Sequence, residues 1–337
     1  MMKPGDIEGV KQLLASSKKV VIIPHRNPDG DAMGSTLGLY HFLKAKGHEP
    51  VVITPNEFPD FLAWMPASET VKVFERETEL CTKILQAAEL IFTLDFNALS
   101  RTGDAMEPVL ASLKVPFIMI DHHQKPGDYA AYTFSDTNYG STCEMIYHFI
   151  AGMGETGFID TTIATCLYTG IVTDSGSFRY PLTTGTTHRI VAEFIDLGVN
   201  NSMVHSLLFD NHSHNRIQIL ARALQNMKVL PEYKTSYTSL SQEELNSFGH
   251  MKGDTEGIVN YGLSMKDIVF TAFFTENKDE GIVKISFRSK GGFDVNMFAR
   301  EHFNGGGHIN AAGGRSNETL DATIQKFIAT LAHTKIE

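Results

Sequence analysis

Short apolar runs that alternate with helix-like segments organise the first half of the chain. Val20–Ile23 is an uninterrupted apolar run that ends at Pro24, which is typical of a strand buried on both faces. Three similar runs follow it. The predicted strands cover 20–23, 50–54, 90–94 and 115–120, and the predicted helices cover 6–17, 31–46, 79–88 and 104–113. This alternation indicates right-handed crossovers and a parallel sheet.

Helical spacing continues beyond the last of these strands. A helix is expected to begin near Ser141, where Ser141 and Glu144 fit a capping box. Two further helices are predicted over 160–172 and 186–197, and the second ends at Gly198. The first of them leads directly to Asp174.

The composition of the chain changes after residue 200. Residues 200–215 are polar and contain His205, His212 and His214, but no carboxylate is spaced to complete a metal site with them. We therefore interpret the stretch as an exposed hinge. A connecting helix is predicted over 217–229, and alternating strands over 235–241, 267–276 and 281–289 predict a smaller domain with an antiparallel sheet.

Length and composition are consistent with two domains. The chain has 337 residues, 42% of them hydrophobic, and no run approaches the ~18 apolar residues of a membrane span. We expect an α/β fold with a parallel-sheet domain over 1–200, a hinge and linker helix over 201–229, and a smaller α+β mixed-sheet domain over 230–337. The first residues lack the apolar core of a signal peptide, and the three cysteines form no CxxC pair, so a reducing cytoplasm is expected.

The net charge of -10 limits the range of partners. Proteins that follow long nucleic acids usually carry a basic face that neutralises phosphates. This chain has no excess of positive charge. If it handles phosphate esters, it therefore needs local positive charge from bound metal and a few arginines. The negative net charge thus favours short or small substrates.

Acidic and imidazole side chains gather where the predicted strands end. His25, Asp29 and Asp31 follow the first strand, and Asp95 follows the strand over 90–94. The strand over 115–120 ends at Asp121-His122-His123. Ligands of open α/β sheets bind at the carboxyl ends of the strands. Three strands that each end on such groups therefore indicate a site.

These residues have the composition of a site for two metal ions. Paired hard cations need several carboxylates, one of which usually bridges them. Mixed oxygen and imidazole ligands suit Mn²⁺ well and tolerate Mg²⁺, Co²⁺ or Fe²⁺. Asp95 is the candidate bridge, because its strand places it at the centre of the sheet. The candidate ligands are His25, Asp29, Asp31, Asp95, His122 and Asp174.

A glycine run near the end of the chain supplies a second candidate feature. Gly305, Gly306 and Gly307 precede His308 and a series of small residues that we expect to form a helix. Glycines at such a position let backbone N–H groups approach an anion. A bare turn would also explain the run, but nearby cations favour a phosphate cradle. These cations are Lys284, Arg288, Lys290, Arg300 and Arg315.

The motifs together resemble the DHH phosphoesterase superfamily with its associated C-terminal domain. They read PHRNPDGDAMGS, LDFN, IDHH, IVTDSGSF and FNGGGHINAAGG, and occur in this order over nearly the whole chain. The two-domain length resembles the NrnA-like branch of nanoRNases, 3',5'-bisphosphonucleoside phosphatases and cyclic-di-AMP or pApA phosphodiesterases. Pro24 and Ser175 depart from commoner residues of the family, and neither is a ligand position.

The resemblance implies two manganese sites that share Asp95. It implies that one ion is held by His25, Asp29 and Asp95, and the other by Asp31, Asp95, His122 and Asp174. It also implies that His123 faces the scissile phosphate. The residues expected to bind the substrate are Arg288, Arg315 and the loop Gly305, Gly306, Gly307 and His308.

The mechanism expected from these residues is metal-assisted hydrolysis of a phosphodiester or terminal phosphomonoester. The metals, His123, Arg288 and His308 would stabilise the charge that develops on the phosphoryl oxygens. Asp121 is expected to orient His122. Phe178 and Tyr180 either stack a base or belong to the core.

Three readings of the function follow. The first is a Mn²⁺-dependent exo-phosphodiesterase for short RNA or DNA oligonucleotides that also acts on pAp or pApA. The second keeps the site but takes polyphosphate or pyrophosphate as substrate. The third, a non-catalytic nucleotide-binding module, is disfavoured because every expected ligand position is filled. No membrane association is expected, and apolar helices near the hinge would suit a homodimer.

Overall fold

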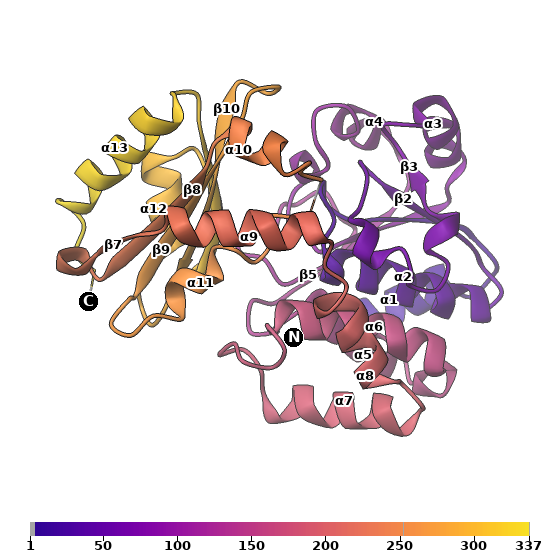
Figure 1. Ribbon diagram of the computed structural model, residues 1–337. Coiled ribbons are helices and arrows are strands. Elements are labelled where there is room, and N and C mark those ends of the chain that lie inside the picture. Colours follow the sequence, from indigo (N-terminus) through magenta and orange to yellow (C-terminus); the bar gives the residue numbers. More distant parts are fainter. Residues whose placement is uncertain (1–3, 252, 337) are drawn as a thin grey trace. The chain divides into compact units, whose positions relative to one another are not determined.

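The chain forms two compact units in a computed structural model that describes residues 4–251 and 253–336. The first unit covers Met1–Asn211 and the second covers His212–Glu337 (Figure 1). Each unit has its own sheet. No helix among the described residues is long and apolar enough to cross a membrane.

The first unit is built on a six-stranded sheet in which every neighbouring pair of strands is parallel. Its strands follow the order β3-β2-β1-β4-β5-β6. The direction of winding reverses between β1 and β4, which makes their carboxyl ends the expected position of a ligand site. The strands are β1 Lys19–Ile23, β2 Glu49–Thr54, β3 Lys72–Val73, β4 Leu90–Leu94, β5 Phe117–Asp121 and β6 Tyr132–Ser135.

Helices cover both faces of this sheet (Figure 1). They are α1 Pro4–Leu13, α2 Gly30–Ala45, α3 Thr78–Ala87, α4 Glu107–Ser112, α5 Thr142–Gly152, α6 Thr161–Asp174, α7 Gly185–Asp196 and α8 Asn201–Phe209. Alternate residues of β1 separate the two cores. Val20 and Ile22 pack with α1, α2, α5 and α6, whereas Val21 and Ile23 pack with α3 and α4. The strands are therefore buried on both faces, as their apolar runs predict.

Three glycines let α2 and α6 pack closely. Gly30, Gly34 and Gly38 are four residues apart and so share one face of α2. A Cβ atom at Gly34 would lie 2.6 Å from the carbonyl oxygen of Cys166, and one at Gly38 would lie 2.6 Å from Leu167. Backbone and side-chain atoms of α6 therefore occupy the space that side chains at these glycines would need. This contact fixes the position of α6, whose last residue is Asp174.

The second unit contains a mixed sheet with the order β11-β12-β10-β9-β8-β7. Phenylalanines such as Phe270 and Phe287 line one face against α12 and α13, while Phe273 on the other face packs with α9 and α10. The elements are α9 His214–Asn226, β7 Lys228–Leu230, β8 Thr235–Leu240, α10 Gln242–Ser247, α11 Asn260–Leu263, β9 Phe270–Asn277, β10 Ile282–Ser289, α12 Val295–His302, β11 Gly306–His308, β12 Ala311–Ser316 and α13 Leu320–Leu331.

The fold class is confirmed, and several local predictions are wrong. The hinge predicted over 200–215 is interrupted by α8, in which Val204 and Leu208 are buried four residues apart. The connecting helix ends at Asn226, and Val229 belongs to β7. The helix expected after the glycine run is instead strand β12. The sheet of the second unit is not fully antiparallel, because β8 and β9 pair in parallel.

Candidate active site

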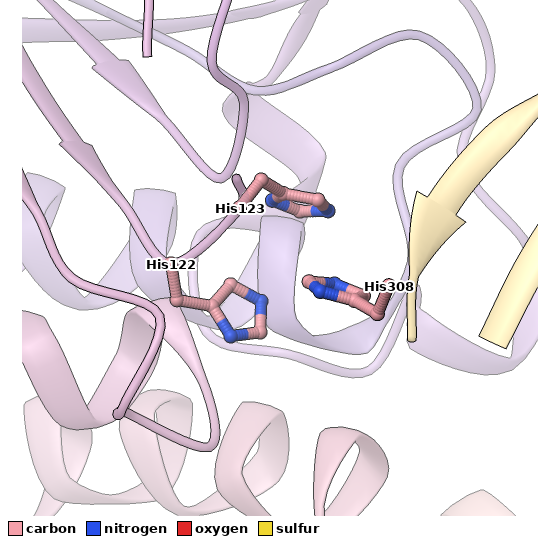
Figure 2. Close-up of side chains that lie close together, drawn as sticks. All are labelled: His122, His123 and His308. Atoms are coloured by element: carbon pink, nitrogen blue, oxygen red, sulfur yellow. The ribbon is translucent and has the colours of Figure 1, made fainter. Parts of the chain in front are cut away.

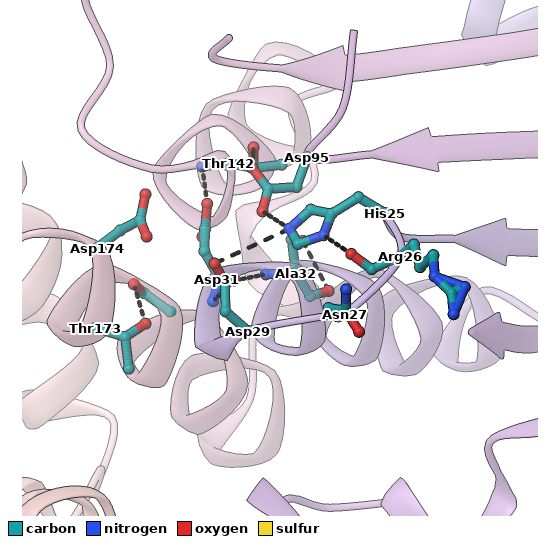
Figure 3. A network of polar contacts seen from close by, with 12 residues as sticks. His25, Arg26, Asn27, Asp29, Asp31, Ala32, Asp95, Thr142, Thr173 and Asp174 are labelled. Carbon is teal, nitrogen blue, oxygen red and sulfur yellow. Dashed lines mark hydrogen bonds and ion pairs between the residues drawn. The ribbon is translucent and has the colours of Figure 1, made fainter. Parts of the chain in front are cut away.

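The loop after β1 presents three of the predicted ligands. His25 and Asp31 are buried, and Asp29 is partly exposed. Asp29 is the N-cap of α2: its Oδ1 accepts hydrogen bonds from the backbone N–H groups of Asp31 and Ala32, both at 3.1 Å. Its other carboxylate oxygen, Oδ2, lies 4.0 Å from Nε2 of His25. One oxygen of Asp29 therefore caps the N-terminus of α2, while the other faces His25 (Figure 3).

Asp95 lies at the centre of the cluster, directly after β4. Its backbone N–H donates to the carbonyl of Ile120, so the residue is anchored to the neighbouring strand β5. Its Oδ2 lies 3.4 Å from Nε2 of His25, and its Oδ1 lies 3.4 Å from Nε2 of His122. The two oxygens of this buried carboxylate thus face two different imidazoles.

The end of β5 contributes Asp121, His122 and His123. The side chains of His122 and His123 project from consecutive positions (Figure 2). Their rings are edge to face, with 4.9 Å between the ring centroids. Nδ1 of His122 donates to the carbonyl of Tyr139 at 3.2 Å. Asp121 accepts from Nδ1 of His123 at 2.7 Å. The prediction that Asp121 orients His122 is therefore wrong, because its carboxylate holds the neighbouring histidine.

Asp174, the last residue of α6, completes a second group of ligand atoms. Its Oδ2 lies 3.3 Å from Nε2 of His122, and Oδ2 of Asp31 lies 3.9 Å from the same nitrogen. Ligand atoms of Asp31, His122 and Asp174 all lie within 4.8 Å of one another. Ligand atoms of His25, Asp29 and Asp95 form another such group. All six predicted metal ligands are thus brought together in the first unit.

Hydrogen bonds orient both imidazoles toward this cluster. Nδ1 of His25 is 2.9 Å from the carbonyl oxygen of Arg26, and Nδ1 of His122 faces that of Tyr139. A carbonyl oxygen only accepts, so Nδ1 carries the proton in each neutral ring and Nε2 carries the lone pair. In both rings Nε2 is the atom that faces the carboxylates. Both histidines are therefore prepared to bind a cation through Nε2.

The electrostatics of the cluster favour bound cations. Burial, followed by the negative charge of Asp95, raises the pKa of Asp31 to about 7. Burial and the charge of Asp31 raise the pKa of Asp174 well above its usual range. Burial lowers the pKa of His25, but the hydrogen bond with Asp95 and the charges of Asp29 and Asp95 outweigh it and raise that pKa to about 9. The carboxylates therefore need added positive charge to ionise together.

The pKa of Asp95 is shifted in the opposite direction from those of Asp31 and Asp174. Burial alone would raise its pKa, but hydrogen bonds with His122 and His25 hold the pKa of Asp95 well below its usual range. Asp95 is consequently ionised between two groups of ligand atoms. Four carboxylates and two imidazoles in this arrangement fit a pair of divalent cations, in which one carboxylate contacts both ions.

The second unit brings some of the predicted substrate-binding residues together. Arg288 on β10 pairs with Ala311 on β12, which pairs in turn with His308 on β11. Arg288 and His308 therefore lie in one row and on one face of the sheet. Arg315 pairs instead with Lys284, which lies four residues before Arg288 on β10. Four residues of a strand span roughly 13 Å. Arg315 is thus separated from the other two.

The glycine run is explained first by packing. A Cβ atom at Gly305 would lie 1.9 Å from the carbonyl oxygen of Gly313, and one at Gly307 would lie 2.4 Å from that of Ala311. The N–H of Gly305 donates to the carbonyl of Ala299, and the N–H of Gly307 donates to Oδ1 of Asn296. These two N–H groups already have acceptors within the protein. The N–H groups of Gly305 and Gly307 are therefore not offered to an anion.

Two aromatic residues have different surroundings. Phe178 packs between Tyr168, at 6.3 Å, and His188, at 5.4 Å between ring centroids. Tyr180 is 41% exposed. Phe178 therefore has a packing role, and of the two only Tyr180 presents much of its ring to solvent.

One residue that contacts the cluster was missed by the sequence prediction. Thr142 donates its hydroxyl hydrogen to Oδ1 of Asp95 at 3.0 Å. The two residues are 47 positions apart, and no local pattern links them. The capping box predicted beside it is half correct. Ser141 accepts from the N–H of Glu144, but the carboxylate of Glu144 accepts from the hydroxyl of Thr187 instead of the backbone of Ser141.

Comparison with known proteins indicates that the chain is a hydrolase that acts on phosphate esters. Residues 19–171 match the DHH family, N-terminal domain, and residues 237–334 match the DHHA1 domain. The chain belongs to the DHH family and carries the DHHA1 domain that the sequence motifs predict.

Individual relatives match along most of the chain. The bifunctional oligoribonuclease and PAP phosphatase NrnA of Thermus thermophilus is 30% identical over 89% of this chain and 85% of its own. The protein of the same name from Bacillus subtilis is 28% identical over 87% and 88%. A crystal structure of an exopolyphosphatase-related protein from Bacteroides fragilis is 38% identical, covers 99% of this chain and 97% of its own, and superimposes with a TM-score of 0.94. The predicted NrnA-like branch is confirmed.

Proposed function

We propose that the protein is a manganese-dependent phosphoesterase that hydrolyses short oligoribonucleotides and small nucleotides such as pAp or pApA. The observation that carries this proposal is the position of Asp95, whose two oxygens each lie 3.4 Å from a different histidine Nε2. His25, Asp29 and Asp95 would hold one ion. Asp31, Asp95, His122 and Asp174 would hold the other.

The bound ions and the protein have separate tasks in this proposal. When bound, two divalent ions supply Lewis-acid stabilisation of the phosphoryl oxygens and acidify a water at neutral pH. The protein supplies the fixed ligands, the low solvent exposure of Asp31 and Asp95, and the hydrogen bonds that orient each imidazole. Mn²⁺ suits this mixture of oxygen and nitrogen ligands, with Mg²⁺ or Co²⁺ as substitutes.

His123 is the proposed contact with the reacting phosphate. Asp121 holds its Nδ1 at 2.7 Å, which fixes the orientation of the ring and the position of Nε2. We propose that Nε2 stabilises charge on a phosphoryl oxygen. In the second unit, Arg288 and His308 are proposed to bind the rest of the substrate from one face of the sheet, on strands that flank β12. The guanidinium of Arg288 can bind a phosphate through two N–H groups.

The choice of substrate is supported by the charge of the chain and by the names of its relatives. The net charge of -10 is unsuited to long nucleic acids. Two relatives that match most of the chain are named as oligoribonucleases and PAP phosphatases. A short oligonucleotide or a bisphosphorylated nucleoside needs few cationic contacts. The row of Arg288 and His308 could supply them.

A rate comparison tests the proposed substrate class. Purified protein is incubated with Mn²⁺ and, separately, with pAp, pApA, a five-nucleotide RNA, cyclic-di-AMP and polyphosphate. We expect the initial rates on pAp, pApA or the RNA to exceed those on polyphosphate, and chelation of the metal to stop hydrolysis. If none of the nucleotides is hydrolysed with Mn²⁺, Mg²⁺ or Co²⁺, the proposal is wrong.

Polyphosphate hydrolysis is the second candidate, because the structure from Bacteroides fragilis is titled as exopolyphosphatase-related. A chain of phosphates without bases would be expected to use several cations along its path. Arg315 lies roughly 13 Å from the row of Arg288 and His308, so a long anion could in principle contact both. A faster rate on polyphosphate that falls in Arg315→Ala would favour this candidate.

A further inference from the structure

Helix α5 begins against the metal-ligand cluster, and its first turn binds two of the proposed ligands. The backbone N–H of Thr142 donates to Oδ2 of Asp31 at 2.6 Å, and that of Cys143 donates to Oδ1 at 2.8 Å. The N–H of Glu144 is taken by the N-cap Ser141. Asp31, a residue of α2, therefore accepts from the first two amides of a different helix. The helix dipole favours its negative charge there.

Thr142 links this arrangement to Asp95. Its hydroxyl donates to Oδ1 of Asp95 at 3.0 Å, and that oxygen also faces Nε2 of His122. One residue thus contacts two carboxylates, Asp31 through its backbone and Asp95 through its side chain. Both carboxylates are proposed ligands of the same ion.

The position of Thr142 is fixed by close packing. The residue is fully buried. A Cβ atom at Gly170 of α6 would lie 2.2 Å from Sγ of Cys143 and 2.9 Å from Oδ1 of Asp31. The start of α5, the carboxylate of Asp31 and the backbone of α6 therefore leave no space for rearrangement. A hydrogen bond made from such a site holds its partner in one orientation.

We propose that Thr142 is a positioning residue that sets the orientation of the Asp95 carboxylate, so that Oδ1 is presented to the ion held by Asp31, His122 and Asp174. Without the hydroxyl, Asp95 is free to rotate about its terminal bond. Because the carboxylate turns as one group, both oxygens then move, and Asp95 offers a less well-placed oxygen to each ion. The inference rests on the proposed function, because it assigns a role within the same metal site.

The test compares three substitutions at this position. Thr142→Val and Thr142→Ala remove the hydroxyl, the first with the original shape and the second with less bulk, and Thr142→Ser retains it. Thr169→Val is the matched control, because Thr169 is also fully buried and its hydroxyl donates only to the carbonyl of Thr165 within α6. Each protein is titrated with Mn²⁺ by calorimetry, and kcat and KM are measured at saturating Mn²⁺.

We expect the Val and Ala variants to weaken the binding of Mn²⁺ by about 10–100-fold, as is usual when a partner of a metal ligand is removed. KM should change little, while kcat falls. Thr142→Ser and Thr169→Val should resemble the wild type. Wild-type binding of both ions by Thr142→Val and Thr142→Ala would overturn the inference. Failure of the wild-type protein itself to bind two ions would instead overturn the proposed function.

Discussion

Asp95 has a left-handed backbone conformation, with φ of 65°, at the end of a buried strand. Such a conformation is unfavourable for residues other than glycine, although asparagine and aspartate tolerate it better than most. The surrounding structure maintains it through the bond from its N–H to Ile120 and the contacts of its carboxylate. Strained conformations of this kind are concentrated at functional sites. Here the turn carries the carboxylate back between His25 and His122.

Replacing Asp95 tests whether charge or backbone conformation is essential. Asp95→Asn keeps a side chain that tolerates the left-handed conformation but removes the negative charge. We expect kcat to fall by more than about 100-fold, beyond the loss usual for partners of metal ligands, with the protein still folded. Asp95→Ala should lose the same activity and about 1 kcal/mol more stability than Asp95→Asn, because alanine is strained at this φ.

Urea unfolding in metal-free buffer and steady-state rates together measure this prediction. The asparagine variant serves as the control for backbone strain in the alanine variant. Turnover by Asp95→Asn at the wild-type rate would remove Asp95 from the mechanism.

The packing of α2 against α6 is the element-level feature that positions the site. The two helices carry Asp31 and Asp174, and they approach closely because Gly30, Gly34 and Gly38 lie between them. Close packing of this kind leaves little freedom for the residues at the helix ends. The ligands are therefore held by rigid elements on two sides of the cluster.

Gly34→Ala tests this helix contact. Its Cβ would lie 2.6 Å from the carbonyl oxygen of Cys166 and 2.9 Å from Sγ of Cys143, so the helices must separate. We expect a loss of about 1–3 kcal/mol in unfolding free energy, as for other overpacked cores, together with weaker Mn²⁺ binding. Gly5→Ala in α1 is the control, since nothing lies within 4 Å of the added atom. Equal stability of the two variants would show that the contact is loose.

The turn between α2 and β2 contains a buried histidine that gives the fold an acid-sensitive position. His48 is 6% exposed, and neither ring nitrogen has a hydrogen-bond partner in the described chain. Burial, followed by the charge of Lys46, lowers the pKa of His48; Glu155 opposes this shift and Lys18 adds to it. A group whose pKa is lower in the folded state stabilises the protein above its unfolded pKa. That contribution is lost as the pH falls.

His48→Leu should therefore reduce the acid sensitivity of the fold. We expect the wild type to lose stability as the pH falls below about 6.5, the ordinary pKa of histidine, with a slope from this residue of at most about 1.4 kcal/mol per pH unit. Burial also lowers the pKa values of His41 and His250. The difference in unfolding free energy between the two proteins, measured in urea from pH 8 to pH 5, isolates His48 from these two residues. A difference that does not change with pH would contradict the prediction.

At the scale of the whole molecule, the chemistry is divided between the two units. The first unit holds all six proposed metal ligands and His123, and the second holds Arg288 and His308 on one face of its sheet. This division accounts for an acidic protein that nevertheless handles phosphate esters. Four carboxylates lie where cations would bind, and we propose that a small number of positive side chains suffices for a short substrate.

Much of the site could be predicted because its residues follow buried strands. An apolar run that ends in a carboxylate is a local signal, and the parallel sheet brings such ends together. The contact of Thr142 with Asp95 and the pairing of Asp121 with His123 depend on side-chain orientations that no local pattern encodes. The strand Ala311–Ser316 was predicted as helix because its small residues are compatible with both structures, and hairpin pairing decides between them.

The central claim is that the cluster around Asp95 binds two divalent ions. An electron paramagnetic resonance titration of the metal-free protein with Mn²⁺ tests it most directly, because two ions that share a carboxylate couple magnetically. We expect two bound ions per chain with a coupled signal, and loss of that signal in Asp95→Asn. A single uncoupled ion in the wild type, or a coupled pair that persists in Asp95→Asn, would contradict it.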